Sequence, residues 1–280
     1  MRLARFRIGD SQPRFGRVDG DAIVDLTEEF GPSLRAVLPT LRERGAEIRA
    51  AHGPRHPLTD VTLLAPIDDP QKYLGIGMNY AQHAEEARAA GIPIPTSQLW
   101  FNKQVSCLND PFGDIVKPAV SDELDYEIEL GVVIGVRAKD VAVEDARSVI
   151  AGYVVANDVS VRDWLQKLSP TFTLGKSFDT HGPIGPWLTT DDEIEDPLAL
   201  RMTLSVNGEV RQDADTSDMI HDIYAQIAYL SQVMTLMPGD ILATGTPSGI
   251  GAPTRNFLKA GDVVRAEIEG LGVIENTVVA

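Results

Sequence analysis

The chain has 280 residues, 41 of them acidic and 25 basic, and a formal net charge of −16. This charge excludes the broad basic surface that binds nucleic acid or an anionic membrane, so an anionic ligand needs a local positive centre, such as a metal ion or a few lysines and arginines. The single cysteine, Cys107, excludes internal disulfides and fits a reducing compartment, and we expect its thiol to be buried.

The N-terminal segment has no apolar stretch of the kind found in secretion signals, and no later run reaches about 18 apolar residues. We therefore expect a cytoplasmic protein. Its length suits one large domain, or a large domain with a small addition.

The first 66 residues predict a small α/β domain. Runs that alternate in polarity are separated by Gly-Asp turns, which is typical of an antiparallel meander, and a helix with Ser33 as its N-cap should follow. The expected elements are strands at 2–8, 14–18, 22–26 and 61–64 and a helix at 34–51. The segment APIDDP, residues 65–70, resembles a linker, so we place the domain boundary near Pro66 and assign residues 67–280 to the large domain.

The sequence DYEIEL predicts a strand with three acidic side chains, Asp125, Glu127 and Glu129, on one face. The run continues as GVVIGV, residues 131–136, which is too apolar for a surface strand. Crowded carboxylates in such a place either take up protons or bind a cation, and their hard oxygens suit Mg²⁺, Mn²⁺ or Ca²⁺. The alternation alone is also compatible with a solvated acidic face.

Two further acidic positions are candidates for the same site. Asp158 follows a predicted apolar strand at 149–156, although Asn-Asp at a strand end is also an ordinary turn signal. In a predicted helix at 79–91, His83 and Glu86 stand three residues apart and share a face, so the carboxylate can orient the imidazole. Because the apolar residues of this helix are nearly all alanine, it has little to bury and is suited to a lid; a plain solvated helix face remains the alternative.

Two nucleotide-binding motifs are excluded. The stretch Gly175-Lys176-Ser177 lacks the earlier glycine of a P-loop, because Pro170 stands there, and the Gly75–Gly77 segment lacks the third glycine of a dinucleotide fingerprint. The glycine-rich loop 244–251 can offer N–H groups and hydroxyls to an anion.

The C-terminal part predicts mainly hairpins. Asn207-Gly208 is a strong turn signal within 202–210, an amphipathic helix is expected at 219–237, and a last hairpin joins 263–268 to 272–279. With no repeated strand–helix–strand rhythm, the fold class is α+β.

Five motifs then occur in the order of one known family. NYAQH, DYEIELGVVIG, NDVSVRDW, LGKSFDTHGPIGPW and GDILATGTPSGIG resemble the sequence blocks of the fumarylacetoacetate hydrolase family from about Tyr73 to the C-terminus, and many members also have a small N-terminal domain. The resemblance implies a mixed β-sandwich roll, a homodimer and a bound Mg²⁺ or Mn²⁺.

The resemblance also implies roles for single residues. Glu127, Glu129 and Asp158 would bind the metal, and His83 with Glu86 would activate water beside the catalytic Lys176. Substrate contacts would come from Tyr80, Arg162, Gln166 and Thr246. Members often have glutamine directly after the tryptophan of this block, where this chain has Leu165 before Gln166. Asp125 is no ligand in the family pattern, and we expect it to form a structural ion pair.

The implied activity is cleavage of a C–C bond in a 2,4-dioxo acid, such as an acylpyruvate or fumarylpyruvate, or decarboxylation of oxaloacetate, through a metal-stabilised pyruvate enolate. A second possibility is a metal-dependent isomerase of a 2-hydroxyhepta-2,4-diene-1,7-dioate-like diacid in aromatic catabolism. A binding module without catalysis would leave the acidic triad, the His-Glu pair and the lysine unexplained.

Overall fold

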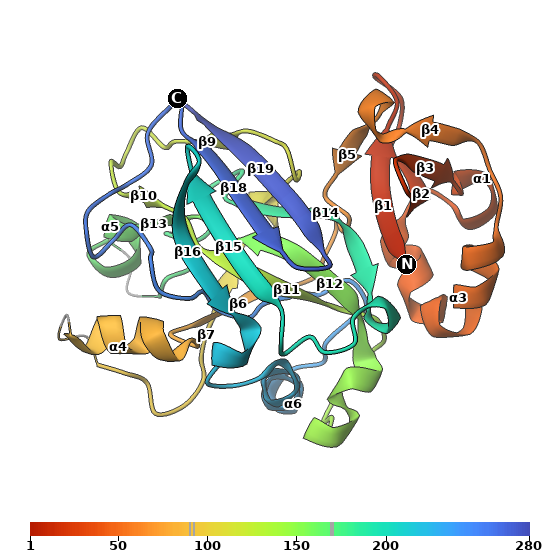
Figure 1. The fold of residues 1–280 in the computed structure, drawn as a ribbon. Coiled ribbons are helices and arrows are strands. Elements are labelled where there is room, and N and C mark those ends of the chain that lie inside the picture. Colours follow the sequence, from red (N-terminus) through yellow and green to blue (C-terminus); the bar gives the residue numbers. More distant parts are fainter. Residues whose placement is uncertain (90, 92, 169–170) are drawn as a thin grey trace.

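A computed structural model describes residues 1–89, 91, 93–168 and 171–280, including the backbone but not the side chain of Gln166. The N-terminal unit, red and orange in Figure 1, lies beside a larger unit. Its strands are β1 (Arg2–Arg7), β2 (Arg14–Asp19), β3 (Ala22–Asp25), β4 (Arg55–Pro57) and β5 (Thr62–Leu64). Its helices are α1 (Thr27–Phe30), α2 (Leu34–Val37) and α3 (Leu41–Ala50), with 3₁₀ turns η1 (Leu38–Thr40) and η2 (Leu58–Asp60).

The larger unit is rich in strands and has few helices. Its strands are β6 (Tyr73–Gly77), β7 (Leu99–Lys103), β8 (Leu108–Asn109), β9 (Ile115–Val116), β10 (Leu124–Asp125), β11 (Ile128–Ile134), β12 (Ile150–Asn157), β13 (Ser160–Val161), β14 (Gly182–Thr190), β15 (Arg201–Val206), β16 (Glu209–Asp215), β17 (Ile241–Ala243), β18 (Val263–Ile268) and β19 (Gly272–Val279). Its helical elements are α4 (Ala81–Ala89), α5 (Arg162–Gln166), α6 (Ile223–Val233), η3 (Val105–Cys107), η4 (Val143–Val149), η5 (Asp191–Glu193) and η6 (Thr216–Asp218).

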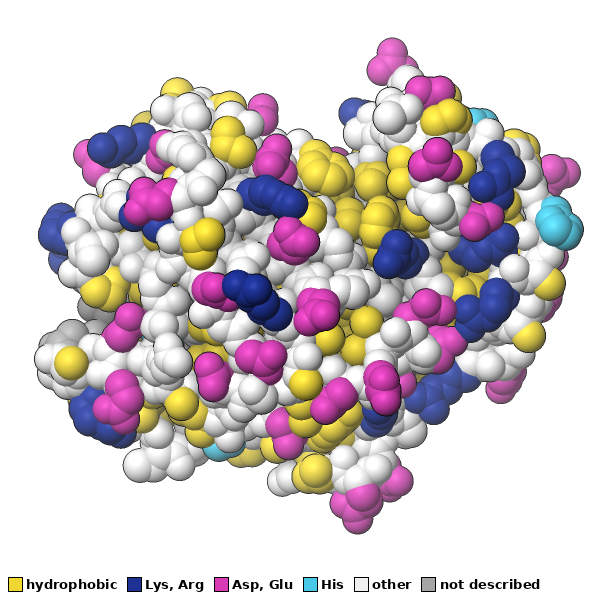
Figure 2. All heavy atoms as spheres, viewed as in Figure 1, with side chains coloured by type: hydrophobic (Ala, Val, Ile, Leu, Met, Phe, Trp, Pro, Cys, Tyr) yellow, Lys and Arg dark blue, Asp and Glu magenta, His cyan; other side chains and the backbone are white. Residues whose placement is uncertain are grey.

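Two sheets carry most of the structure. The large sheet has the order β4-β3-β2-β1-β14-β12-β11-β17-β6-β7, and the second has the order β16-β15-β18-β19-β9. The pairing of β1 with β14 joins the N-terminal meander to the central strands, with Arg2 opposite Thr189. This mixed arrangement confirms the α+β class. On the face shown in Figure 2, acidic and basic side chains are interspersed, and apolar ones gather between the N-terminal unit and the rest.

Strand β11 is buried on both faces. Because side chains alternate, Leu130 and Val132 belong to the core between the two sheets, while Val133 joins a second core formed with the N-terminal helices. The prediction of a buried strand is therefore confirmed. Val132 and Val133 are already buried within this single chain, so these apolar side chains provide no argument for a dimer.

Several predicted elements differ in their bounds. The helix expected at 34–51 is divided into α2, η1 and α3, where Pro39 cannot donate a backbone hydrogen bond. The acidic strand is also interrupted, between Asp125 and Ile128. There the Glu127 N–H donates to the side chain of Asn157, at 3.0 Å, instead of to a strand neighbour, and the chain passes from the pair β10–β13 into β11.

The strongest local signals are confirmed. Asn207 and Gly208 both have positive φ, 53° and 81°, as a tight hairpin turn requires, and they join β15 to β16. The two strands of the final hairpin, 263–268 and 272–279, have the predicted bounds. Cys107 is buried as expected.

Candidate active site

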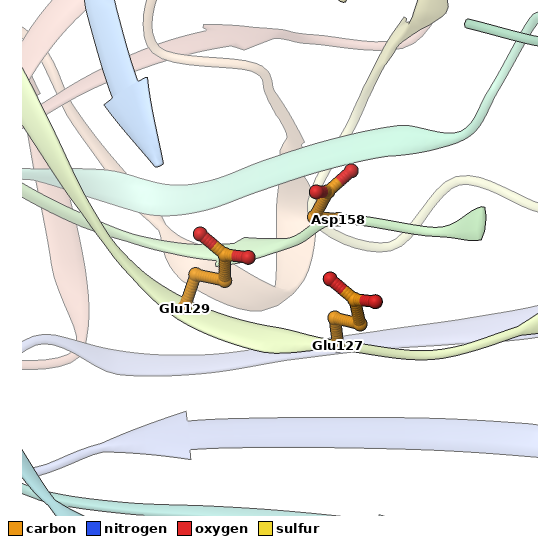
Figure 3. Close-up of side chains that lie close together, drawn as sticks. All are labelled: Glu127, Glu129 and Asp158. Atoms are coloured by element: carbon orange, nitrogen blue, oxygen red, sulfur yellow. The ribbon is translucent and has the colours of Figure 1, made fainter. Parts of the chain in front are cut away.

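Three carboxylates meet where β11 begins and β12 ends. Ile128 pairs with Asn157 and Glu129 with Ala156, so Glu127 and Asp158 flank the same end of the strand pair, and the Asp158 N–H donates to the Glu127 carbonyl at 2.8 Å. Ligand oxygens of Glu127, Glu129 and Asp158 all lie within 4.8 Å of one another, and the three residues are buried. Figure 3 shows the three side chains lying close together. The predicted triad therefore assembles.

Two lysines hold Asp158. Lys176 Nζ lies 2.7 Å from Asp158 Oδ2 and 2.7 Å from Glu127 Oε2, so it bridges two members of the triad. Lys103 Nζ lies 2.6 Å from Asp158 Oδ1 and also donates to the carbonyls of Val159 and His181. Both carboxylate oxygens of Asp158 therefore have a cationic partner.

Lys103 is the main residue that the sequence reasoning missed. Its side chain is completely buried, at the end of β7. The signal was present, because strand alternation places Lys103 on the same face as the buried Phe101, and a lysine on an apolar face needs a buried partner.

The predicted ion pair of Asp125 is confirmed. Arg162 Nε lies 2.8 Å from Asp125 Oδ2, and Arg162 Nη2 lies 2.7 Å from Glu127 Oε1. Asp125 also accepts hydrogen bonds from the N–H groups of Gly251 and Ala252. It therefore fastens the loop that follows β17 to the arginine that contacts the triad.

With all four of its carboxylates ionised, the cluster is not neutral. In the described chain, four buried carboxylates, those of Asp125 and the triad, face the three cations Lys103, Arg162 and Lys176. One negative charge is left over. A divalent ion would convert it into one positive charge, which suits an anionic ligand.

Glu129 carries this excess. Burial raises the pKa of Glu127, but Lys176 and Arg162 outweigh burial and hold that pKa at about 2. Burial, together with the nearby Asp158 and Glu127 charges, raises the pKa of Glu129 well above its ordinary value. Glu129 accepts a hydrogen bond from the Gly245 N–H at 2.7 Å, and within the described residues it forms no ion pair. The oxygen donors and the missing positive charge fit Mg²⁺ or Mn²⁺.

A cavity of about 370 Å³ opens onto this cluster. Its inner end is lined by Glu127, Arg162 and Lys176, and helix α4 contributes His83 and Glu86 to the lining. Another cavity, of about 430 Å³, lies between α3 and the central sheet, but residues of the carboxylate cluster do not line it.

Helix α4 places the predicted dyad at the cavity. His83 Nδ1 lies 3.5 Å from Glu86 Oε2, and their side chains are 15% and 38% exposed. An Nδ1–H directed at Glu86 leaves Nε2 as the proton acceptor. Of the nine helix residues only Ala84 and Ala87 are buried, as expected of a helix with little to pack.

The remaining predicted substrate contacts are placed differently. Tyr80 does not line the cavity: it is fully buried in the main core, where its hydroxyl donates to Met202 Sδ at 3.2 Å. Thr246 lines the cavity, but its hydroxyl donates to the Ile128 carbonyl and accepts from Gln212. The side chain of Gln166 lies outside the described residues.

Family models cover nearly the whole chain. The model for the fumarylacetoacetate (FAA) hydrolase C-terminal domain matches residues 72–279, and the Rv2993c-like N-terminal model matches residues 1–66. The chain belongs to the fumarylacetoacetate hydrolase family. This confirms the resemblance seen in its five motifs.

Relatives of this family member carry several activities in their names. The mitochondrial oxaloacetate tautomerase fahd2 of Xenopus laevis is 42% identical over 292 residues, spanning 100% of this chain and 90% of that protein. Maleylpyruvate hydrolase from Sphingobium sp. SYK-6, solved with manganese(II) and pyruvate, is 36% identical with a TM-score of 0.84, covering 100% and 99%. The 2-hydroxyhepta-2,4-diene-1,7-dioate isomerase from Mycobacterium marinum is 35% identical with a TM-score of 0.81, covering 100% and 98%.

These relatives are enzymes, and this chain shares their fold. Hydrolase, isomerase and tautomerase names all occur among them, so membership places the chain in a family of enzymes but does not settle the class of reaction. Within the described residues, none of the helices is both long and apolar enough to span a bilayer.

Proposed function

We propose that this protein is a divalent-metal-dependent hydrolase that cleaves a C–C bond in a 2,4-dioxo acid and releases pyruvate. The observation that carries this proposal is that one cavity is lined by Glu127 of the buried carboxylate triad, by Lys176 and by His83. A proton acceptor and a positive centre therefore face the same substrate. The manganese and pyruvate bound by the maleylpyruvate hydrolase support the proposal.

Glu127, Glu129 and Asp158 would hold the ion. A divalent ion bound there would attract the carboxylate and 2-oxo oxygens of the substrate and stabilise negative charge on them. Lys176 adds a second positive charge at the same end. In this structure burial lowers the pKa of Lys176, but Asp158 and Glu127 raise it by more, so the pKa lies above its ordinary value.

His83 and Glu86 perform the proton transfers. With Nδ1–H directed at Glu86, His83 Nε2 removes a proton from water, and the water oxygen adds to the C4 carbonyl. The C3–C4 bond then breaks, its electron pair moves toward C3 and the 2-oxo oxygen, and C4 leaves as a carboxylic acid. C3 takes up a proton, for which protonated His83 is the available donor, and pyruvate results. The imidazole is thereby returned to its starting state.

Proton transfer without cleavage is the second candidate. It is favoured by the 42% identical relative named an oxaloacetate tautomerase and by the neighbouring isomerase structure. The same residues suffice, because His83 can move a proton to or from carbon while Lys176 faces the oxygen. Oxaloacetate decarboxylation would use the same inner end of the cavity.

A substrate panel distinguishes these reactions. Acylpyruvates, fumarylpyruvate and oxaloacetate are incubated with protein loaded with Mg²⁺ or Mn²⁺, and released pyruvate is measured beside the ultraviolet absorbance of the enol. Pyruvate formed from a 2,4-dioxo acid in step with carboxylic acid supports hydrolysis. Loss of enol absorbance without release of pyruvate would contradict hydrolysis and support the tautomerase or isomerase reaction.

The assembly and compartment are also proposals. We infer a homodimer from family membership alone, and a monomeric mass by light scattering at micromolar concentration would contradict it. Cytoplasmic residence also stays a prediction, since similar proteins include ones named mitochondrial. Fractionation of the source cells tests it.

A further inference from the structure

The outer end of the active-site cavity has a charge pattern that the proposed reaction does not use. Of the described side chains that line this cavity, four are cationic and three are carboxylates, with His83 counted as neutral. The whole chain, in contrast, has 41 acidic and 25 basic residues. The side chains that line the cavity therefore carry a small positive excess, four cations against three carboxylates, whereas the whole chain is strongly negative.

Two of these cations lie at the mouth and share one carboxylate. Arg255 Nη2 is 3.2 Å and Lys167 Nζ 3.5 Å from Glu123 Oε1. The arginine side chain is 72% exposed and the lysine side chain 66%, while Glu123 is only 17% exposed. Two exposed cationic donors that share one largely buried acceptor have hydrogen-bonding capacity left for a further anion.

The position of Arg255 is supported from its own loop. Its guanidinium lies over the ring of Phe257, 5.6 Å from the ring centroid, and Phe257 also lines the cavity. Stacking of this kind restricts an exposed arginine without using its donors.

The cavity also has apolar lining. Phe101, Leu165, Phe172 and Ile250 contribute to it, and Phe101 and Phe172 meet edge to face with ring centroids 6.1 Å apart. A cavity of about 370 Å³ falls within the range of roughly 300–1,000 Å³ that holds drug-sized ligands. The cavity therefore has room for an elongated ligand with one charged group at Lys176 and a second charged group at its other end.

We propose that Arg255 and Lys167 form a carboxylate subsite that selects 2-oxo acids carrying a second carboxylate beyond an apolar middle section. Without ligand, Glu123 forms ion pairs with both cations, and the carboxylate of the ligand displaces it. This inference rests on the proposed function for the position of the 2-oxo head, but it assigns the opposite end of the substrate. None of the residue roles given above includes this trio.

The test compares two substrates of equal length. One is a 2,4-dioxo acid that ends in a carboxylate, and the other carries a primary amide in its place. Wild type should show a lower KM for the diacid, and Arg255→Gln should reduce that preference about tenfold, the effect expected of losing a hydrogen bond to a charged group. Lys167→Gln should reduce it by a smaller factor.

Glu123→Gln tests the opposite direction. It keeps the shape of the side chain but removes the competing charge, so the preference for the diacid should increase by a few fold. Arg201→Gln is the matched control for Arg255→Gln, since Arg201 is 67% exposed and paired with Asp213, outside the cavity lining. It makes the same change in net charge as Arg255→Gln and should leave the preference unaltered.

Calorimetry of the same two compounds separates this inference from the proposed reaction. If wild type releases no pyruvate but binds the diacid more tightly, and Arg255→Gln removes this difference, the reaction is wrong and the subsite stands. If Arg255→Gln and Arg201→Gln have equal effects, or Arg255→Gln alters diacid and amide equally, the subsite is refuted.

Discussion

The carboxylate cluster and helix α4 face the same cavity but are built in opposite ways. Glu127, Glu129 and Asp158 are buried at the ends of paired strands, and buried cations hold two of them. Helix α4, in contrast, buries only two alanines, and its His83 and Glu86 remain partly exposed. The site therefore combines a fixed group of charges with a proton acceptor on a lightly packed helix.

This difference separates stability from rate. Removing a partner from the cluster leaves a buried charge uncompensated, which strongly lowers the stability of the fold. Removing a side chain from α4 exposes little and leaves no buried charge behind. Substitutions in the cluster should therefore lower stability and metal affinity, while substitutions in α4 should lower the rate.

His83→Ala should have the largest effect on rate. Loss of general-base catalysis typically costs about 10²- to 10⁴-fold, so acylpyruvate hydrolysis should fall by that factor while the melting temperature changes little. Oxaloacetate decarboxylation needs no attacking water and should fall much less. Glu85→Ala, on the exposed side of the same helix, is the control. Hydrolysis within a few fold of wild type, at unchanged metal occupancy, would reduce His83 to an ordinary helix residue.

Lys103→Met should have the largest effect on stability. It leaves Asp158 Oδ1 without its buried cation, and breaking a buried ion pair typically costs about 3–5 kcal/mol. Chemical denaturation of the metal-free protein measures this. Lys139→Met is the matched control, because Lys139 also contacts one carboxylate and two carbonyls but is 35% exposed. Equal losses in the two variants would show that burial of Lys103 is not the cause.

Glu127→Gln should weaken metal binding more than it disturbs the fold. The amide keeps the shape of the side chain and one acceptor oxygen, but it removes one negative charge from the triad. The affinity for Mn²⁺, measured by calorimetry, should fall by about 10- to 100-fold, the range seen when the surroundings of a metal are altered. Unchanged affinity would remove Glu127 from the ligand set.

Ser248→Ala should have the smallest effect. The Ser248 hydroxyl donates to Gln82 Oε1 at 3.3 Å and so connects α4 to the loop after β17. An exposed hydrogen bond of this kind contributes about 0.5–1 kcal/mol, so KM should rise by roughly two- to fivefold. Ser248→Thr keeps the hydroxyl and should restore the wild-type value; failure to do so would exclude this contact as the reason.

The sequence predicted the elements that local chemistry determines. Asn207-Gly208 requires positive φ, which fixed the hairpin, and the apolar run of β11 indicated a buried strand. The alternation of Asp125, Glu127 and Glu129 indicated a cluster of carboxylates, and the structure groups them although the strand is interrupted. Arg162 contacts both Asp125 and Glu127 across the break.

Tertiary contacts determined what the sequence could not supply. Lys103 approaches Asp158 from 55 positions earlier in the chain, and nothing local to β7 identifies that partner. Tyr80 directly precedes helix α4 in sequence, but its ring lies in the core, where its hydroxyl contacts Met202. The trio of Glu123, Lys167 and Arg255 likewise comes from three separate segments.

Metal removal tests the central claim most directly. The protein is stripped with a chelator, its metal content is confirmed to be zero, and pyruvate release from a 2,4-dioxo acid is followed while Mg²⁺ or Mn²⁺ is added back. Because the triad offers only carboxylate oxygens, activity should be absent in the stripped protein and should return in proportion to bound metal. Full activity in the metal-free protein would contradict the account.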